Sequence, residues 1–366
     1  MTEQKNKPLL TLIIGAYRHE HFIRQAVEGA FAQTYSPLQI ILSDDASTDR
    51  TFEIMTEMAA AYRGPHEIVL NRNPKNLGLA GHVNRAVQLA RGELLVFSAG
   101  DDISLPHRVQ TSWEAWESTG RKAFGVHGMI INIGESYQPE VGKTWEPMPN
   151  QARHFQDGPS VLEGYIRSAT PVILGAAAAW SRTLFERFGP LPEDVVYEDM
   201  ALAFRSMLSG GLVFLDQPLI LYRLHGNNIH HSESKYVATW KELQADEERI
   251  RVSLKRKLVI AKTFRADLEK ARALKMMPES EISRLLDEVG IFERGHAWEL
   301  SYREAGFFRR LGLLFSRPDR GTQRRKIPAR LLYRLPPAWC YNSIRILKNR
   351  LRPKSSEAGR RAHGTA

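Results

Sequence analysis

Two pairs of neighbouring carboxyl groups, Asp44-Asp45 and Asp101-Asp102, are the residues of this sequence best suited to chemistry. Adjacent carboxylates repel each other and are hard to keep ionised without a cation nearby. Oxygen ligands favour Mg²⁺ or Mn²⁺, and these ions usually lie between carboxylates and the phosphates of a substrate. The two pairs therefore indicate a site for a divalent ion and a phosphorylated ligand.

Alternating apolar strands and amphipathic helices surround these pairs over the first 100 residues. Four short apolar runs predict strands at Leu9–Ile14, Leu38–Ser43, Glu67–Leu70 and Glu93–Ser98. Helical periodicity predicts helices at His21–Thr34, after a cap at Ser47 or Thr48, and at Ala80–Ala90. This order is typical of a parallel sheet with helices on both faces, which makes the chain an α/β protein.

Ligands bind such sheets beyond the carboxyl ends of the strands. Ala16 and Tyr17 follow the first strand, Asp44-Asp45 follow the second, and Asp101-Asp102 follow the fourth. A single acidic pair is as well explained by turn or helix-cap residues, but two pairs at equivalent strand ends favour a ligand site. The chain has neither G-x-G-x-x-G nor G-x-x-x-x-G-K-[ST], so carboxylates and a metal would hold a nucleotide here.

Composition limits the classes of protein that the chain could represent. Its 366 residues predict more than one substructure, and its single cysteine, Cys340, excludes an intrachain disulfide. The first residues carry no secretory pattern, and no run approaches the length of a membrane span. The net charge of +10 arises in residues 301–366, which hold 17 Lys and Arg against 3 Asp and Glu.

The second half of the chain contributes a third acidic pair, Glu198-Asp199, at the predicted start of a helix that ends at Gly210-Gly211. The helix dipole alone favours carboxylates there. The other predicted elements are a helix at Pro106–Ser118, a strand at Phe124–Asn132, a loop at Gly134–Gly158, a strand at Val172–Ala179, a short helix up to Phe188, a strand at Leu219–Leu224 and helices over Thr239–Asp287.

Three stretches carry a resemblance to a known family. They are LLTLIIGAYRHEHFIRQAVEGAFAQTY, IILSDDASTDRT and NLGLAGHVNRAVQLARGELLVFSAGDD. Their order and spacing resemble the nucleotide-sugar-binding half of the family 2 glycosyltransferases, which have the GT-A fold. The resemblance is dense over residues 8–110 and looser to about residue 232. It implies a mostly parallel sheet flanked by helices, to which the sequence adds a helical C-terminal extension.

The resemblance also implies roles for individual residues. Asp45, with Asp44 beside it, would read the base, and Asp101 and Asp102 would bind ribose and a divalent metal, Mn²⁺ or Mg²⁺. Either Asp101 or Asp102 is open as the metal ligand, because Ala99-Gly100-Asp101-Asp102 stands where the family often has Asp-Ala-Asp-Asp. Gly15-Ala16-Tyr17-Arg18 likewise replaces the usual Pro-Thr-Tyr-Asn, and Ala16 and Tyr17 are expected beside the nucleotide.

In the second half the resemblance implies that Asp199 is the catalytic base of an inverting reaction. Glu198 would orient it or pair with a basic neighbour such as Arg205. The ending Tyr222-Arg223-Leu224-His225 is similar to family endings near the diphosphate, so Arg223 is expected at the nucleotide and His225 at phosphate or metal.

The expected function is transfer of a sugar from a UDP- or dTDP-linked donor to a saccharide or lipid-linked saccharide in cell-surface polysaccharide synthesis. The expected divisions are 1–110 for the nucleotide-sugar half, 111–235 for the acceptor and catalytic half, and 236–366 for a basic helical region. Arginines mixed with aromatic residues in 301–366 favour contact with an anionic membrane at its cytoplasmic face, or packing on the catalytic domain, over RNA binding. A sugar-nucleotide nucleotidyltransferase and a non-catalytic basic adaptor of membrane or nucleic acid are the alternatives.

Overall fold

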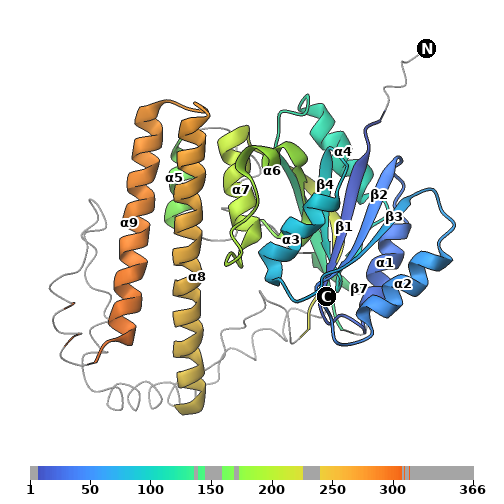
Figure 1. Ribbon diagram of the computed structural model, residues 1–366, viewed down its shortest axis with the longest axis horizontal. Helices are drawn as coiled ribbons and strands as arrows, with labels where there is room; N and C mark the ends of the chain where they lie inside the picture. Colours follow the sequence, from blue (N-terminus) through green and yellow to red (C-terminus); the bar gives the residue numbers. More distant parts are fainter. Residues whose placement is uncertain are drawn as a thin grey trace, which may run out of the picture. The chain divides into compact units, whose positions relative to one another are not determined.

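A computed structural model of the chain describes residues 7–135, 139–144, 159–168, 173–225 and 240–306, together with 309 and 313 (Figure 1). The chain divides into two compact units. The first contains residues 1–231 and 259–289, and the second contains residues 232–258 and 290–366. Part of the predicted C-terminal helical region, residues 259–289, therefore groups with the sheet.

The first unit is built on a mixed sheet whose strands follow the order β3-β2-β1-β4-β8-β6-β9-β5, with β7 paired to β6. The strands are β1 Leu10–Ala16, β2 Leu38–Asp44, β3 Glu67–Arg72, β4 Leu94–Ala99, β5 Ile103–Ser104, β6 Gly125–Ile133, β7 Pro139–Thr144, β8 Ala178–Ser181 and β9 Leu212–Arg223. β1, β2, β3 and β4 run parallel, and so do β6 and β9, whereas β8 pairs antiparallel to both β4 and β6. The four strands predicted in the first 100 residues are confirmed, and their parallel pairing places their carboxyl ends at one edge.

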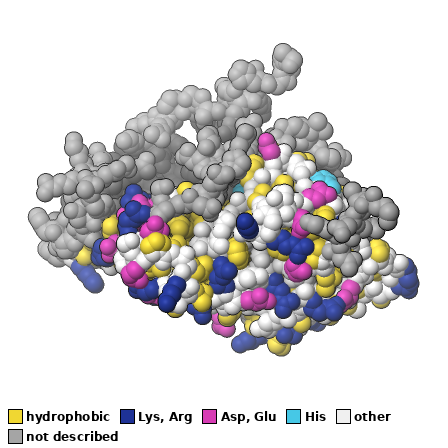
Figure 2. All heavy atoms as spheres, turned by 90° about the horizontal axis from the view of Figure 1, so that it is seen from above, with side chains coloured by type: hydrophobic (Ala, Val, Ile, Leu, Met, Phe, Trp, Pro, Cys, Tyr) yellow, Lys and Arg dark blue, Asp and Glu magenta, His cyan; other side chains and the backbone are white. Residues whose placement is uncertain are grey.

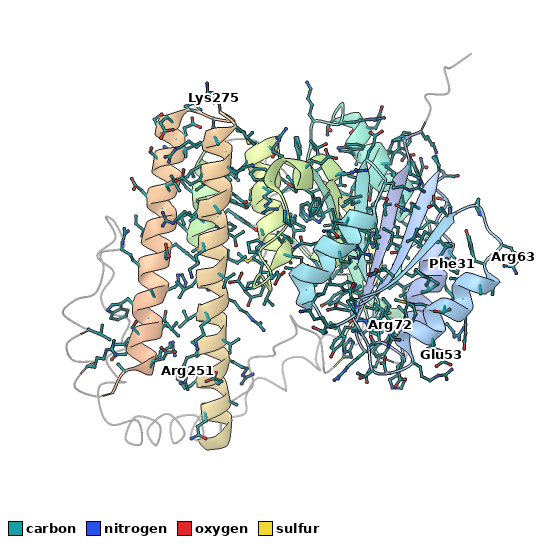
Figure 3. The ribbon with its side chains drawn as sticks, in the orientation of Figure 1. Phe31, Glu53, Arg63, Arg72, Arg251 and Lys275 are labelled. Carbon is teal, nitrogen blue, oxygen red and sulfur yellow. The ribbon has the colours of Figure 1, made fainter. Side chains whose placement is uncertain are left out.

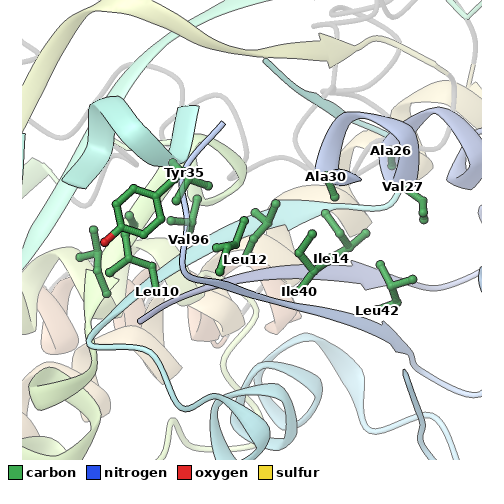
Figure 4. Packing of buried hydrophobic residues seen from close by; sticks show 14 of the residues in the cluster. Leu10, Leu12, Ile14, Ala26, Val27, Ala30, Tyr35, Ile40, Leu42 and Val96 are labelled. Carbon is green, nitrogen blue, oxygen red and sulfur yellow. The ribbon is translucent and has the colours of Figure 1, made fainter. Parts of the chain in front are cut away.

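Helices cover both faces of this sheet. They are α1 Ile23–Phe31, α2 Thr51–Ala61, α3 Gly78–Leu89, α4 Arg108–Ser118, α5 Pro159–Ser168, α6 Arg182–Phe188 and α7 Glu198–Ser209, with a 3-10 turn, η1, at Gly175–Ala177. α1, α2 and α4 share one core with the alternate residues Leu10, Leu12 and Ile14 of β1 (Figure 4). The remaining face receives α3 and α6, since Phe97 of β4, which points away from that core, contacts Phe185 of α6. The predicted α/β class, with a sheet flanked by helices, is confirmed.

Several predictions for local structure are wrong. The cap of α2 is Arg50 and makes no side-chain capping bond, because the hydroxyl of Ser47 instead accepts a hydrogen bond from the backbone of Arg18. The predicted loop at 134–158 contains β7, whose backbone pairs with β6. The strand or strand-like segment predicted at 172–179 contains the 3-10 turn η1 at Gly175–Ala177, and the β8 strand begins only at Ala178.

α7 and α8 are joined by buried contacts within the first unit. α8 spans Trp240–Ala273 and α9 spans Glu279–Glu304. Nε of Arg205 lies 3.0 Å from Oδ2 of Asp267, and both side chains are almost fully buried. The rings of Phe204 and Phe264 stack with centroids 4.1 Å apart. This part of α8 is therefore part of the packing that holds α7.

The second unit has its own contacts. Arg303 forms ion pairs with Glu247 and Glu299, and the rings of Trp298 and Tyr302 stack at 5.3 Å.

None of the helices in the described residues has the length and apolar character needed to cross a membrane. Figure 2 shows acidic and basic side chains interspersed over the described surface of one face. Most of residues 301–366, which carry the basic excess, lie outside the described residues.

Candidate active site

The first two acidic pairs lie at the carboxyl edge of the sheet, at the ends of β2 and β4, with β1 between these strands. The carbonyl of Ala16, at the end of β1, accepts a hydrogen bond from the backbone of Asp45 at 2.9 Å. Tyr17 follows with 38% of its surface exposed, which makes it one of the few large apolar side chains open to solvent. Arg18 and Ala46 have positive φ angles of 57° and 60°, so the turns after β1 and β2 are both strained.

Asp44 and Asp45 are buried and hydrogen-bonded to the loops around them. Oδ2 of Asp44 accepts from the backbone of Ser47 at 2.9 Å and lies 3.6 Å from Nε of Arg72. In Figure 3, Arg72 lies at the end of the sheet where α2 begins, and its guanidinium lies over Phe52. Asp45 accepts from the side chain of Asn73 and from two backbone N–H groups at the start of α3. Both residues therefore shape the loops that would surround a base.

Asp101 and Asp102 differ in their surroundings. Oδ2 of Asp101 accepts from Nε2 of His225 at 2.9 Å. Burial alone would raise the pKa of Asp101, but this hydrogen bond and the charge of His19 bring it below its ordinary value. Burial and the charge of Asp101 raise the pKa of Asp102 well above its ordinary value. Oδ1 of Asp102 accepts from the backbone of Arg223, and Oδ2 has no hydrogen-bond partner among the described residues.

His19 is a residue of this site that the sequence analysis missed. Its Nε2 lies 3.7 Å from Oδ2 of Asp101, and the carboxylates of Asp44 and Asp49 also act on its charge. It therefore lies between the two acidic pairs. The sequence feature that could have identified His19 is its position in the loop GAYRHEH, directly after the first strand, where ligand-facing residues are expected.

Arg223 is fully buried and directs its guanidinium at the protein itself. Nε donates to the carbonyl of Asp101 at 2.9 Å, Nη1 donates to the carbonyls of Gly134 and Glu135, and Nη2 donates to Gln25 at 2.6 Å. These bonds tie the end of β9 to the acidic turn after β4. The contact expected between Arg223 and a nucleotide stays a prediction. The observed hydrogen bonds give Arg223 a role in positioning Asp101.

Glu198 and Asp199 begin α7, as predicted. Asp199 is buried, whereas Glu198 is half-buried as a residue, with its Oε2 atom buried and without a hydrogen-bond partner among the described residues. A Cβ atom built on Gly175 of η1 would lie 2.6 Å from Oε1 of Glu198, so the backbone of η1 lies close to the end of this side chain. Burial raises the pKa of Glu198 to about 8, and the neighbouring Asp199 carboxylate adds to the rise. Oδ1 of Asp199 accepts from the backbone of Met200 at 2.7 Å.

Arg205 does not pair with Glu198, so that expectation is wrong. Arg205 lies about two helical turns further along α7. Its guanidinium bonds Asp267 and the carbonyl of Gly189 instead. No basic side chain on α7 therefore neutralises the acidic pair.

Arg108, a second residue that the sequence analysis missed, links the two ends of the site. It is fully buried, and Nη2 donates to the carbonyls of Phe97 in β4 and Ala176 in η1. Burial lowers the pKa of Arg108, and the nearby charge of Asp102 opposes that effect. Because Gly175 lies close to Glu198, the guanidinium connects the turn beside the α7 carboxyls to β4, the strand that precedes Asp101 and Asp102. All three acidic pairs thus belong to one connected region.

The side chains after β4 and at the end of β9 are suited to bind a divalent ion that a substrate also helps to coordinate. Asp101, Asp102 and His225 offer carboxylate oxygens and one imidazole nitrogen, and Oδ2 of Asp102 is a buried atom without a partner in the described structure. Within the described ranges, no group of three or more His, Cys, Asp or Glu is arranged to hold a metal by itself. An ion shared with phosphates needs only one or two protein carboxylates, so the residues fit that kind of site.

Two solved structures share the fold of this chain. The Staphylococcus aureus protein TarS, residues 1–349, crystallised with UDP-GlcNAc, aligns over 93% of this chain and 88% of its own with a TM-score of 0.52 and 14% identity. The mannosyltransferase PcManGT of Pyrobaculum calidifontis, in complex with GDP-Man and Mn²⁺, aligns over 95% and 88% with a TM-score of 0.50 and 16% identity. The fold is therefore the GT-A glycosyltransferase fold.

A family model matches the first part of the chain. Residues 11–170 match the family described as Glycosyl transferase family 2. These residues include β1 to β4 and both acidic pairs of the sheet edge. This part of the chain is therefore similar to glycosyltransferase family 2, the family that its motifs resemble.

Curated relatives share parts of the chain. An uncharacterized glycosyltransferase, alr2836, of Nostoc sp. is 24% identical over 235 residues, which are 61% of this chain and 67% of that protein. The Escherichia coli UDP-Glc:alpha-D-GlcNAc-diphosphoundecaprenol beta-1,3-glucosyltransferase WfaP is 35% identical over 94 residues, which are 26% of this chain and 36% of that protein. The aligned part therefore spans between about a third and two thirds of these relatives.

Proposed function

We propose that the protein is an inverting glycosyltransferase that uses a nucleoside diphosphate sugar, UDP- or dTDP-linked. The connection of the sheet-edge carboxyls to Glu198 and Asp199 through Arg108 and η1 carries this proposal. It places groups suited to a nucleotide and groups suited to proton transfer in one region. The family of residues 11–170 supports the same reaction class.

The nucleotide would lie across the ends of β1, β2 and β4. Tyr17 has the exposed ring needed to stack on a base, and Asp45 supplies an acceptor for a base N–H. Asp101 would receive a ribose hydroxyl. His225 holds the Asp101 carboxylate, and Arg223 holds the backbone carbonyl of Asp101, through the contacts described above.

Asp101, Asp102 and His225 would hold a divalent ion, Mn²⁺ or Mg²⁺, which when bound offsets the negative charge of the leaving diphosphate. Asp199 would remove the proton of the acceptor hydroxyl as its oxygen attacks the anomeric carbon. The bond from that carbon to the diphosphate breaks, and the nucleoside diphosphate leaves with the electron pair. Glu198 would orient Asp199 without taking part in the proton transfer.

The acceptor would be a saccharide or a lipid-linked saccharide in cell-surface polysaccharide synthesis. WfaP, whose name states a diphosphoundecaprenol-linked acceptor, supports a lipid-linked one. The basic segment 301–366, most of which lies outside the described residues, would hold the enzyme on the cytoplasmic face of an anionic membrane.

The proposal is tested by thermal unfolding with UDP in the presence and absence of Mn²⁺. A nucleotide that binds only the folded state stabilises it by about 2.7 kcal/mol at one hundred times its Kd. We expect a metal-dependent rise in the unfolding temperature, and donor hydrolysis with a member of a nucleotide-sugar panel. No stabilisation by any nucleoside diphosphate and no hydrolysis would refute the proposal.

A further inference from the structure

A chain of buried polar side chains leads from the interior of the first unit to Asp45. Nδ2 of Asn73 donates to Oδ1 of Asp45 at 2.8 Å. Nδ2 of Asn71 donates to Oδ1 of Asn73 at 3.0 Å and to Oγ of Ser43 at 2.9 Å. Oγ of Ser43 lies 2.7 Å from Nε2 of His82. These residues come from β2, β3, the turns that follow them and α3, and all five are buried.

The direction of these hydrogen bonds is fixed. Asn71 uses both N–H bonds of its amide nitrogen, one toward Ser43 and one toward Asn73. The oxygen of the Asn73 amide must therefore face Asn71, and its nitrogen must face Asp45. The reversed amide would set an oxygen against the Asp45 carboxylate and leave an N–H of Asn71 unpaired in the interior, which is costly.

These hydrogen bonds hold the Asp45 carboxylate so that its oxygens can accept a further hydrogen bond from a ligand. Leu77 and Gly78 add backbone N–H bonds at 2.9 and 3.1 Å, so N–H groups approach both carboxylate oxygens from the protein side. Gly78 has φ +71°, a conformation that favours glycine and aims its N–H at Oδ2. An oxygen held in this way binds a base that carries an N–H and rejects one that offers a lone pair at the same position.

We propose that Asn73 is a positioning residue for Asp45, held in direction by Asn71, Ser43 and His82, and that this relay makes the site prefer uracil over cytosine. The inference rests on the proposed binding of a nucleoside diphosphate. Uracil carries a hydrogen on ring nitrogen N3, whereas the same nitrogen of cytosine is a hydrogen-bond acceptor. Rotation or displacement of the Asp45 carboxylate would remove this distinction between the two bases, while the ribose and phosphates would keep their own contacts in the proposed site.

The experiment is calorimetric titration of the full chain with UDP and with CDP, in the presence of Mn²⁺. The variant is Asn73→Ala, and the matched control is Asn84→Ala. Asn84 is an asparagine of α3 that also makes two hydrogen bonds, both with the backbone of Leu191. The measured quantity is the ratio of UDP affinity to CDP affinity, which a general loss of stability does not change.

We expect the wild type to prefer UDP by about a hundredfold or more. Asn73→Ala is expected to lower this ratio by about ten- to a hundredfold, as for loss of one hydrogen bond to a charged group. Asn84→Ala should leave it within about twofold. If Asn73→Ala fails to fold, Ser43→Ala, which removes the anchor of Asn71, should lower the ratio by about threefold.

The remaining outcomes distinguish failure of the relay from failure of the proposed function. An unchanged ratio in a folded Asn73→Ala protein, or a wild type that binds UDP and CDP equally, overturns the relay and leaves the glycosyltransferase proposal standing. An equal fall of the ratio in Asn84→Ala also overturns it. A wild type that binds neither nucleotide refutes the proposed function itself.

Discussion

Replacing Glu198 by glutamine tests the electrostatics of the α7 start through the pH dependence of stability. The Glu198 carboxyl is buried and shares its surroundings with Asp199, and together these raise its pKa from an ordinary value of 4.5 to about 8. Below pH 4.5 the group is protonated in both the folded and the unfolded chain, so it imposes no penalty. Between pH 4.5 and 8 the unfolded chain releases the proton and the folded chain keeps it, so the wild type loses stability as the pH rises.

The size of this loss follows from about 1.36 kcal/mol for each pKa unit. The wild type should lose about 3 kcal/mol by pH 7 and about 5 kcal/mol, as a ceiling, above pH 8 through this one group. The glutamine side chain of the variant cannot ionise, so the variant escapes the loss. Any cost of the new amide is the same at all pH values and does not affect the slope.

The assay is urea-induced unfolding of the wild type and Glu198→Gln at about pH 5.5, 7.0 and 8.5, which span the window between the two pKa values. The free energy of unfolding of the variant, relative to that of the wild type, should increase steadily over this range. Glu186→Gln is the control, since the Glu186 side chain is 58% exposed on α6 and the same substitution should give a flat difference. Parallel curves for the wild type and Glu198→Gln would show that the carboxyl is not held neutral.

Further predictions concern the reaction and the tail. Asp199→Asn should lower kcat by about 10²–10⁴-fold, because the amide cannot accept the acceptor's proton, with little change in donor affinity by calorimetry; near-normal turnover would leave Asp199 as a helix-start residue only. Asp102→Ala, or failing that Asp101→Ala, should abolish stimulation of turnover by Mn²⁺ or Mg²⁺, and full activity of both variants in excess chelator would contradict a metal site. Asp45→Ala should weaken UDP binding by about 1.5 to 3 kcal/mol, and unchanged affinity would remove Asp45 from the site. Removal of residues 301–366 should keep donor hydrolysis and release the protein from anionic vesicles in sedimentation; continued sedimentation would assign the tail another role.

The sequence predicted the strands that end at the site because each is a short apolar run closed by polar residues. It also predicted α7, whose buried residues Met200, Phe204 and Leu208 repeat at helical spacing. It did not reveal β7, because the segment Pro139–Thr144 carries no apolar pattern even though its backbone pairs with β6, the strand just before it.

His82 and Arg108 were not predicted because each has a hydrogen-bond partner that lies far from it in the sequence. His82 lies in α3 among apolar residues, and nothing in the periodicity distinguishes a buried imidazole bonded to Ser43 from a surface one. Arg108 was equally hidden, because a fully buried arginine is rare and its partners are backbone carbonyls of β4 and η1. The acidic pairs could be found because carboxylates at strand ends form a local pattern, whereas their supporting contacts come from distant parts of the chain.

A shortened form of the protein has to extend well past the region that matches the family. A fragment that ended near residue 235 would keep Arg205, which is 2% exposed, and would lose its partner Asp267. Removing one partner of a buried ion pair typically costs about 3 to 5 kcal/mol. The ring of Phe204 would also be stripped of the Phe264 ring that covers it. Fragments meant for crystallisation or donor screening should therefore run at least to Ala273, where α8 ends.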